Sequence, residues 1–165
     1  MNGFINFINN LTFKQLLMWI LVIIVIIVFI VVAKNYIENQ IEENKKDKKD
    51  EEQKKKEDAV LNASNEVNTE LLSYGLSQYN QMVSELVQAF TMYGTDEEAV
   101  YNVLRKCKTK SDFLKLVEVF GIKGIYTGTL WFTIEGNLYD HLAYELDNAE
   151  KQEANKILSQ IGVSI

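Results

Sequence analysis

Few residues in this 165-residue sequence are spaced in a way that supports catalysis. His141 is the only histidine and Cys107 the only cysteine, so no second imidazole or thiol can complete a zinc site. No sequence pattern pairs the two as a nucleophile and its base, and Cys107 follows Val100 by seven residues on an apolar helical stripe. The sequence predicts a packed or surface histidine and a buried structural thiol.

Pairs of carboxylates are a second route to chemistry, because one can act as an acid and the other as a base. The candidate pairs are Glu97 with Glu98 and Asp140 with Glu145. They lie in an acidic segment, residues 59–165, which carries fourteen Asp or Glu against eight Lys or Arg, so such pairs arise by chance. We therefore expect no enzyme, no cofactor and no metal site, and the negative charge argues against a nucleic-acid partner.

The first element of the chain is an apolar stretch over residues 16–33, LLMWILVIIVIIVFIVVA, which has no charge, amide, hydroxyl, glycine or proline. As a helix it covers about 27 Å, close to the ~30 Å hydrocarbon thickness of a bilayer. This pattern predicts a single transmembrane helix with the lipid bilayer as its partner. Its representative anchor residues are Leu16, Trp19, Ile24, Phe29 and Val32.

Residues 1–15 form a lead-in to this span whose apolar positions also suit an interfacial helix. The apolar run is longer than that of a signal peptide and only Lys14 precedes it, so an uncleaved anchor is favoured over a cleaved signal. More Lys residues follow the span than precede it, which favours a cytoplasmic C-terminal domain. The opposite orientation stays open.

Residues 34–58 form a charged spacer. Residues 45–58 within this spacer hold seven positive and six negative side chains, so they cannot form a hydrophobic core. Favourable i,i+4 pairs such as Glu52 with Lys56 suit a solvated helix, and a coil is the alternative.

Residues 59–165 have the pattern of a small all-α domain. Helix-period apolar runs predict helices over residues 59–74, 77–93, 96–107, 110–120, 138–146 and 148–160, with their apolar faces in one core. Glycines that suit helix ends are Gly75, Gly94, Gly121 and Gly162. Capping boxes are predicted at Thr95 with Glu98, Thr109 with Asp112, Asn137 with Asp140, and Asp147 with Glu150.

A glycine- and aromatic-rich insertion, residues 122–136, interrupts the helices. Its β-favouring residues predict a short hairpin that turns near Thr127 and Gly128. Three aromatic residues there, Tyr126, Trp131 and Phe132, either cap the helical core or form an exposed surface for a protein partner.

The runs GTDEEAVYNVLRKCKTKSDFLKLVEVFG and GNLYDHLAYELDNAEKQEANKIL together resemble a single annexin-type repeat over residues 94–161. They are similar in particular to divergent annexin-like modules of Bacteroidota bacteria and their phages. The resemblance implies a calcium-binding loop ahead of Gly94 and Thr95, completed by a distant carboxylate. Here Met92 stands where the family has glycine, and the best distant acid, Asp140, is displaced by the insertion.

These features predict a membrane-anchored, non-enzymatic interaction or scaffold protein that binds a protein partner or a second copy of itself. A structural component of a phage or mobile element is one form that such a protein takes. The first alternative is an envelope-acting module for lysis or peptidoglycan processing, which needs the domain outside the cytoplasm. A weaker alternative, implied by the resemblance, is calcium-dependent lipid binding.

Overall fold

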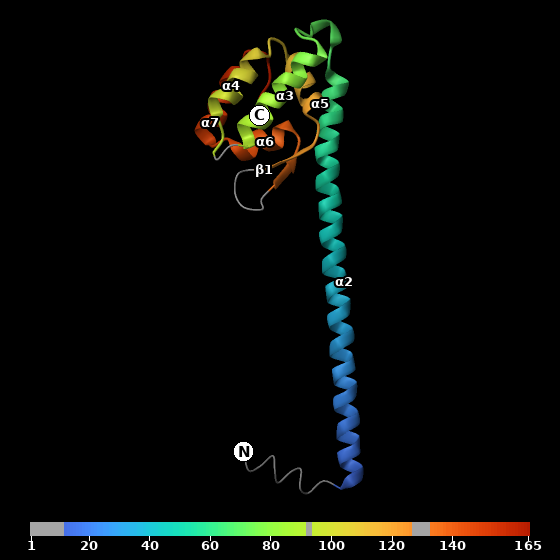
Figure 1. Ribbon diagram of the computed structural model, residues 1–165. Helices are drawn as coiled ribbons and strands as arrows, with labels where there is room; N and C mark the ends of the chain where they lie inside the picture. Colours follow the sequence, from blue (N-terminus) through green and yellow to red (C-terminus); the bar gives the residue numbers. More distant parts are fainter. Residues whose placement is uncertain (1–11, 92–93, 127–132) are drawn as a thin grey trace. The chain divides into compact units, whose positions relative to one another are not determined.

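The computed structural model describes residues 12–91, 94–126 and 133–165, and it is mostly helical (Figure 1). Its elements in order are α2 (Phe13–Glu66), the 3-10 helix η1 (Thr69–Leu71), α3 (Leu76–Thr91), α4 (Glu97–Lys106), α5 (Lys110–Phe120), β1 (Lys123–Tyr126), β2 (Thr133–Gly136), α6 (Leu138–Glu145) and α7 (Asn148–Ser159). The chain divides into two compact units, Met1–Asp50 and Glu51–Ile165. The helical class predicted from the sequence is confirmed, and the two strands form one small antiparallel sheet.

The first unit contains the apolar part of α2, which is long and apolar enough to cross a membrane. Every side chain from residue 17 to residue 32 is exposed, including Trp19 at 52% and Phe29 at 73%. Such a row of exposed apolar groups is unfavourable in water, since each square ångström costs about 25 cal/mol.

The charged residues 34–58 are helical, which decides between the helix and coil alternatives. Salt bridges one turn apart support the helix, with Lys34 Nζ 3.6 Å from Glu38 Oε1 and Lys56 Nζ 3.1 Å from Glu52 Oε1. Residues 51–58 already belong to the second compact unit, although the sequence boundary of the domain was expected at residue 59.

The second unit is a helical bundle with one core. Helix α3 packs against α4 and α5, and α4 packs against α7, so apolar stripes from all of these helices meet (Figure 1). The largest fully buried side chains are Tyr79, Phe90, Phe113, Phe120, Leu86, Leu104, Leu116, Leu138, Leu142, Leu146, Leu158 and His141. The predicted single core is thus present.

Three of the four predicted capping boxes are confirmed, those of Thr109, Asn137 and Asp147. The fourth is wrong. Asp96 is the N-cap of α4, because its Oδ1 accepts from Ala99 N at 2.9 Å, and a carboxylate there also favours the positive end of the helix.

The predicted helix over residues 59–74 is confirmed only as far as Glu66, where α2 ends, and it is wrong for residues 67–74. Asn68 begins the short η1 by accepting from Glu70 N at 3.0 Å, and its own N–H is bound by Ser111 Oγ at 3.2 Å. Gly75, expected after a helix, precedes α3 instead.

The predicted hairpin is confirmed. Strands β1 and β2 are antiparallel, with Lys123 opposite Gly136 and Tyr126 opposite Thr133. The predicted turn at Thr127 and Gly128 lies outside the described residues.

Candidate functional site

The candidate partner surface on the hairpin is described only in part. Tyr126 ends β1 with 46% of its side chain exposed, while the neighbouring Ile125 is buried at 2% and fixes the strand to the core. Trp131 and Phe132 lie outside the described residues. Tyr126 is therefore an outward-facing aromatic group on an anchored strand.

The base of the hairpin rests on His141 of α6. The Nε2 atom lies 3.1 Å from the carbonyl oxygen of Lys123, the first residue of β1. Phe90 stacks on the imidazole with ring centroids 5.7 Å apart, and Phe120 packs against it at 5.4 Å. With 0% of His141 exposed, the structure shows a packed histidine.

The ionisation of His141 is governed by this environment. Burial lowers the pKa of the imidazole below its ordinary value, and the Lys123 carbonyl and the carboxylates of Glu145 and Asp140 oppose that effect without cancelling it. A carbonyl can only accept, so Nε2 carries the proton and Nδ1 keeps a lone pair. Nδ1 has no hydrogen-bond partner among the described residues.

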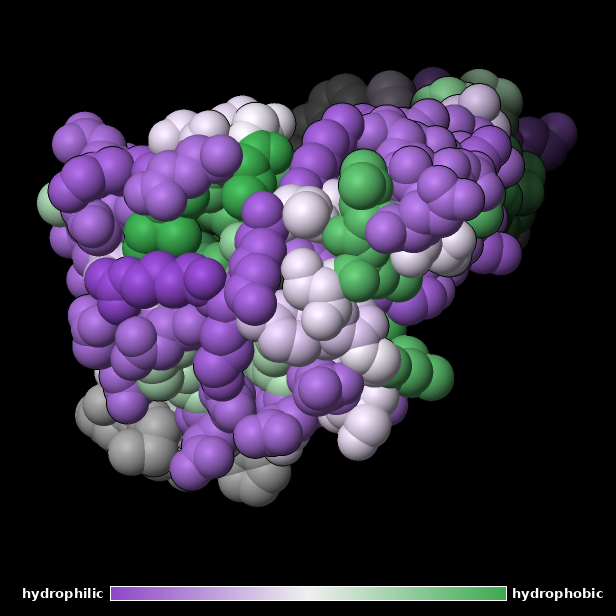
Figure 2. All heavy atoms as spheres, turned by 90° about the horizontal axis from the view of Figure 1, so that it is seen from above, coloured by the Kyte–Doolittle hydropathy of each residue, from purple (hydrophilic) through white to green (hydrophobic). Residues whose placement is uncertain are grey.

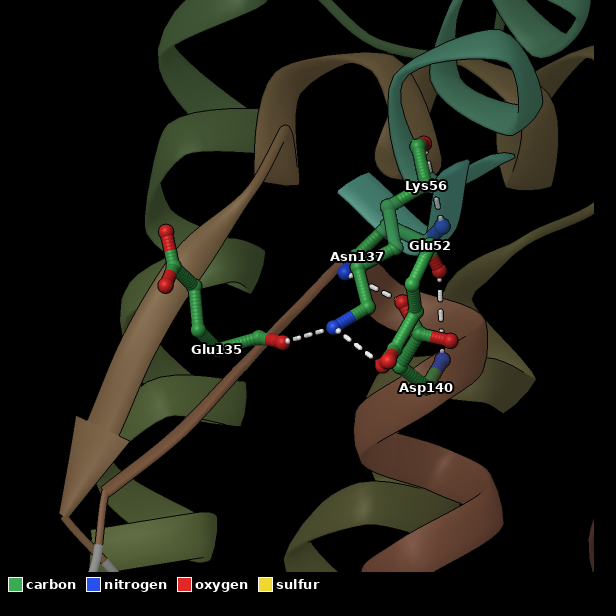
Figure 3. A network of polar contacts seen from close by, with 5 residues as sticks. All are labelled: Glu52, Lys56, Glu135, Asn137 and Asp140. Carbon is green, nitrogen blue, oxygen red and sulfur yellow. Dashed lines mark hydrogen bonds and ion pairs between the residues drawn. The ribbon is translucent and has the colours of Figure 1, made fainter. Parts of the chain in front are cut away.

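A polar network joins the C-terminal part of α2 to the hairpin and to α6 (Figure 3). Lys56 Nζ donates to the carbonyl oxygen of Glu135 in β2 at 2.8 Å and lies 3.1 Å from Glu52. Asn137 Nδ2 donates to the Lys56 carbonyl at 3.2 Å, while its own backbone N–H donates to Asp140 Oδ2 at 2.8 Å. Asn137 is 2% exposed, so its own bonds to Lys56 and Asp140 are largely shielded from water and help to fix this turn of α2 on the domain.

This network predicts a measurable contribution of Lys56 to stability. Replacing Lys56, whose side chain is 19% exposed, by methionine should destabilise the domain by about 1–2 kcal/mol, because the Glu135 carbonyl loses its donor. The exposed Lys55→Met variant is the matched control and should change stability by less than about 0.5 kcal/mol. Urea unfolding of the full chain in detergent micelles measures both. Equal losses in the two variants would contradict the assigned role.

Asp112 is the most heavily hydrogen-bonded carboxylate among the described residues. Its Oδ1 accepts from Ser73 N at 2.7 Å and from Tyr79 Oη at 2.6 Å. Its Oδ2 accepts from Ser73 Oγ at 2.7 Å, Lys108 N at 2.9 Å and Thr109 N at 3.1 Å. With 0% exposure and five donors, this side chain ties the α2–α3 connection to the start of α5.

The five donors also make stability depend on pH. Burial alone raises the pKa of the Asp112 carboxyl, but hydrogen bonds from Ser73, Tyr79 and Lys108 outweigh it, so the pKa lies below the ordinary 3.8. An unfolded carboxyl takes up its proton first as pH falls, so this stabilisation is complete above pH 3.8 and is lost below it. We expect a steep fall in unfolding free energy below that pH. Asp112→Asn should show a flatter acid limb in the same urea titrations, and an unchanged slope would contradict this account.

Cys107 is a buried structural thiol, as the sequence predicted. Its side chain is 6% exposed, and burial, helped by the nearby Asp112 carboxylate, raises the pKa of the thiol to about 12. We expect native Cys107 to react with iodoacetamide at pH 8 roughly 10³-fold more slowly than the urea-unfolded chain, since only the thiolate reacts. Mass spectrometry over time measures this difference. Comparable rates with and without urea would show that the thiol is accessible.

Three of the four carboxylates in the candidate pairs, those of Glu98, Asp140 and Glu145, have structural partners. Glu98 Oε1 binds Arg105 at 2.7 Å, and Asp140 belongs to the capping box of α6. The acid that contacts the Gly94–Thr95 turn is Glu145, whose Oε2 accepts from Thr95 Oγ1 at 2.7 Å. Sequence reasoning chose Asp140 for that position and missed the contact of Glu145.

No group of three or more His, Cys, Asp or Glu side chains is placed to hold a metal ion within the part of the chain that the structure describes. None of the family models, curated proteins or solved structures compared with this sequence matches it.

Proposed function

We propose that this protein is a single-pass membrane protein whose C-terminal helical domain binds another protein and has no enzymatic activity. The observation that carries the proposal is the exposed apolar row on α2, residues 17–32. Burial in lipid removes this row from water, and residues 16–33 have the length that a bilayer core requires.

The hairpin residue Tyr126 is the proposed contact to the partner. Tyrosine supplies large contact area at low conformational-entropy cost and is enriched where interfaces hold most of their binding energy. Trp131 and Phe132, five and six residues further along the chain, are proposed to belong to the same surface. Figure 2 shows that hydrophilic side chains cover most of the face that it draws and that apolar groups gather there only in small patches.

The proposed contact is tested with a photo-crosslinking amino acid in place of Tyr126, in the full chain in its native membranes. The control is the same replacement at Leu76, which is 60% exposed at the start of α3 and lies outside the proposed surface. A discrete crosslinked product at position 126 and none at 76 is expected. Equal products at both positions, or none at either, would count against this surface.

Two measurements separate the anchor from the alternatives. The intact mass of the membrane-bound protein retains residues 16–33 if they are an anchor and lacks them if they are a cleaved signal. A Lys49→Cys variant in intact cells, treated with an impermeant thiol reagent, reports the side of the domain, because the buried Cys107 does not compete. Labelling at 49 favours the envelope-acting alternative, and protection until lysis favours a cytoplasmic interaction protein.

The annexin resemblance enters this proposal as a fold relation over residues 94–161. The weaker alternative, calcium-dependent lipid binding, is tested by adding calcium in a thermal unfolding experiment. The main proposal expects no shift, and a rise that grows with calcium concentration would favour the alternative.

A further inference from the structure

Two side-chain atoms on α6 are buried and have no hydrogen-bond partner among the described residues, and they are His141 Nδ1 and Glu145 Oε1. The two residues are four positions apart on one helix, so their side chains lie on the same face, one turn apart. Buried polar atoms in folded proteins are nearly always paired. Their position on one face therefore indicates a single partner that both atoms share.

The imidazole of His141 is held in the way that metal-binding histidines are held. Its Nε2–H donates to the carbonyl of Lys123 at 3.1 Å, which leaves the lone pair on Nδ1. The rings of Phe90 and Phe120 pack against the imidazole, which is 0% exposed. A backbone carbonyl on the opposite nitrogen is usual for a metal-bound imidazole, because it fixes the tautomer and orients the ring.

The carboxylate of Glu145 is oriented by a similar contact. Its Oε2 accepts from Thr95 Oγ1 at 2.7 Å, which leaves Oε1 for a second interaction. The ion pairs of the described residues include none of Glu145. The ammonium of Lys123 lies over the Phe120 ring, 5.8 Å from its centroid. A carboxylate with a buried oxygen needs a positively charged partner, and a bound cation provides one.

The surroundings of the imidazole favour such a cation. The carbonyl of Gly136, the last residue of β2, and the carboxylates of Glu145 and Asp140 all stabilise positive charge there. Asp140 already accepts from the backbone N–H of Asn137 at 2.8 Å (Figure 3), so it contributes negative potential rather than a ligand. Three donors of suitable chemistry are thus the imidazole, Glu145 and the Gly136 carbonyl.

We propose that His141 Nδ1, Glu145 Oε1 and the carbonyl oxygen of Gly136 bind one zinc ion, which fastens the end of β2 to α6. An imidazole nitrogen with two oxygen ligands suits zinc, and water completes its four positions, whereas calcium takes oxygen ligands. The site uses two side chains and one main-chain oxygen, so it lacks the three acidic, histidine or cysteine ligands of a typical cluster. It does not rest on the function proposed above.

Calorimetric titration of the full chain in detergent micelles with zinc chloride tests the site. The chain carries no histidine tag, and a Cys107→Ser background removes the only thiol. We expect one zinc ion per chain. Glu145→Gln keeps an oxygen that accepts from Thr95, and His141→Gln keeps a donor to the Lys123 carbonyl, yet each should weaken binding at least about tenfold.

Glu70→Gln is the matched control, because that carboxylate is exposed on η1, and its zinc affinity should equal that of the parent chain. The absence of one-to-one binding, or equal affinity in all variants, would overturn the proposal.

Nuclear magnetic resonance of the imidazole decides the question if a variant does not fold. As the only histidine, His141 gives one set of ring-nitrogen signals. Zinc should shift the Nδ1 signal while Nε2 keeps its proton, and calcium should shift neither. An Nδ1 signal that does not respond to zinc would refute the site and favour a bridging water that donates to both buried atoms. The Tyr126 crosslink is a separate measurement, so the zinc site and the proposed function can fail independently.

Discussion

Replacing Asp112 by asparagine is expected to lower the unfolding free energy of the domain by about 3–5 kcal/mol, a large share of the 5–15 kcal/mol typical of folded domains. The hydroxyls of Ser73 and Tyr79 can rotate to accept from the new amide. Backbone N–H groups can only donate, so they cannot accept a hydrogen bond from this amide. If the NH₂ group takes the place of Oδ1 it faces Ser73 N–H, and if it takes the place of Oδ2 it faces the N–H groups of Lys108 and Thr109. In either orientation at least one backbone donor in this shielded site loses its acceptor.

Asp140→Asn is the matched control for this prediction. Both residues occupy the third position of a capping box, but Asp140 is only partly buried and binds a single backbone N–H, that of Asn137 at 2.8 Å. We expect a loss of less than about 1 kcal/mol. Urea unfolding of both variants in micelles, followed by near-ultraviolet circular dichroism, gives the comparison. Similar losses would mean that the motif, rather than the five donors, determines the contribution of Asp112.

Local signals explain most of what was predicted correctly about the fold. The boxes at Thr109, Asn137 and Asp147 each involve residues three apart, so a short stretch of sequence contains the whole motif. The end of α2 at Glu66 could not be found in this way. It depends on residues some forty positions away, such as the Thr109 hydroxyl that binds the Leu71 carbonyl at 3.0 Å.

The same distinction applies to the candidate site. Tyr126 could be named as a candidate from the sequence because an aromatic residue near glycines is visible there. The contacts of Lys56 and His141 could not be predicted. Lys56 donates to the backbone carbonyl of Glu135 and His141 to that of Lys123, and every residue type has such an acceptor. The sequence offers no pattern that could have revealed these two contacts.

The membrane anchor carries the other large expected effect. Introducing arginine at both Ile24 and Val28, near the centre of residues 16–33, should move the protein from the membrane to the soluble or aggregated fraction. Each central arginine costs about 2.5–3.5 kcal/mol, and each apolar residue in the span contributes about 0.3–0.6 kcal/mol, so two substitutions offset most of the gain from the whole span. Alkaline extraction of membranes followed by immunoblotting measures the partition.

The same two substitutions at Ile37 and Ile41 form the control, since these residues are also exposed on α2 and one turn apart but lie beyond residue 33. This variant should stay in the membrane fraction. Loss of both variants from the membrane would mean that charge anywhere on the helix disrupts the protein. Retention of both would mean that residues 16–33 do not provide the attachment, which would remove the observation on which the proposed function depends. A transmembrane span predicts that only the variant with arginines at Ile24 and Val28 leaves the membrane, because the free-energy cost of inserting a charge is highest at the centre of the bilayer.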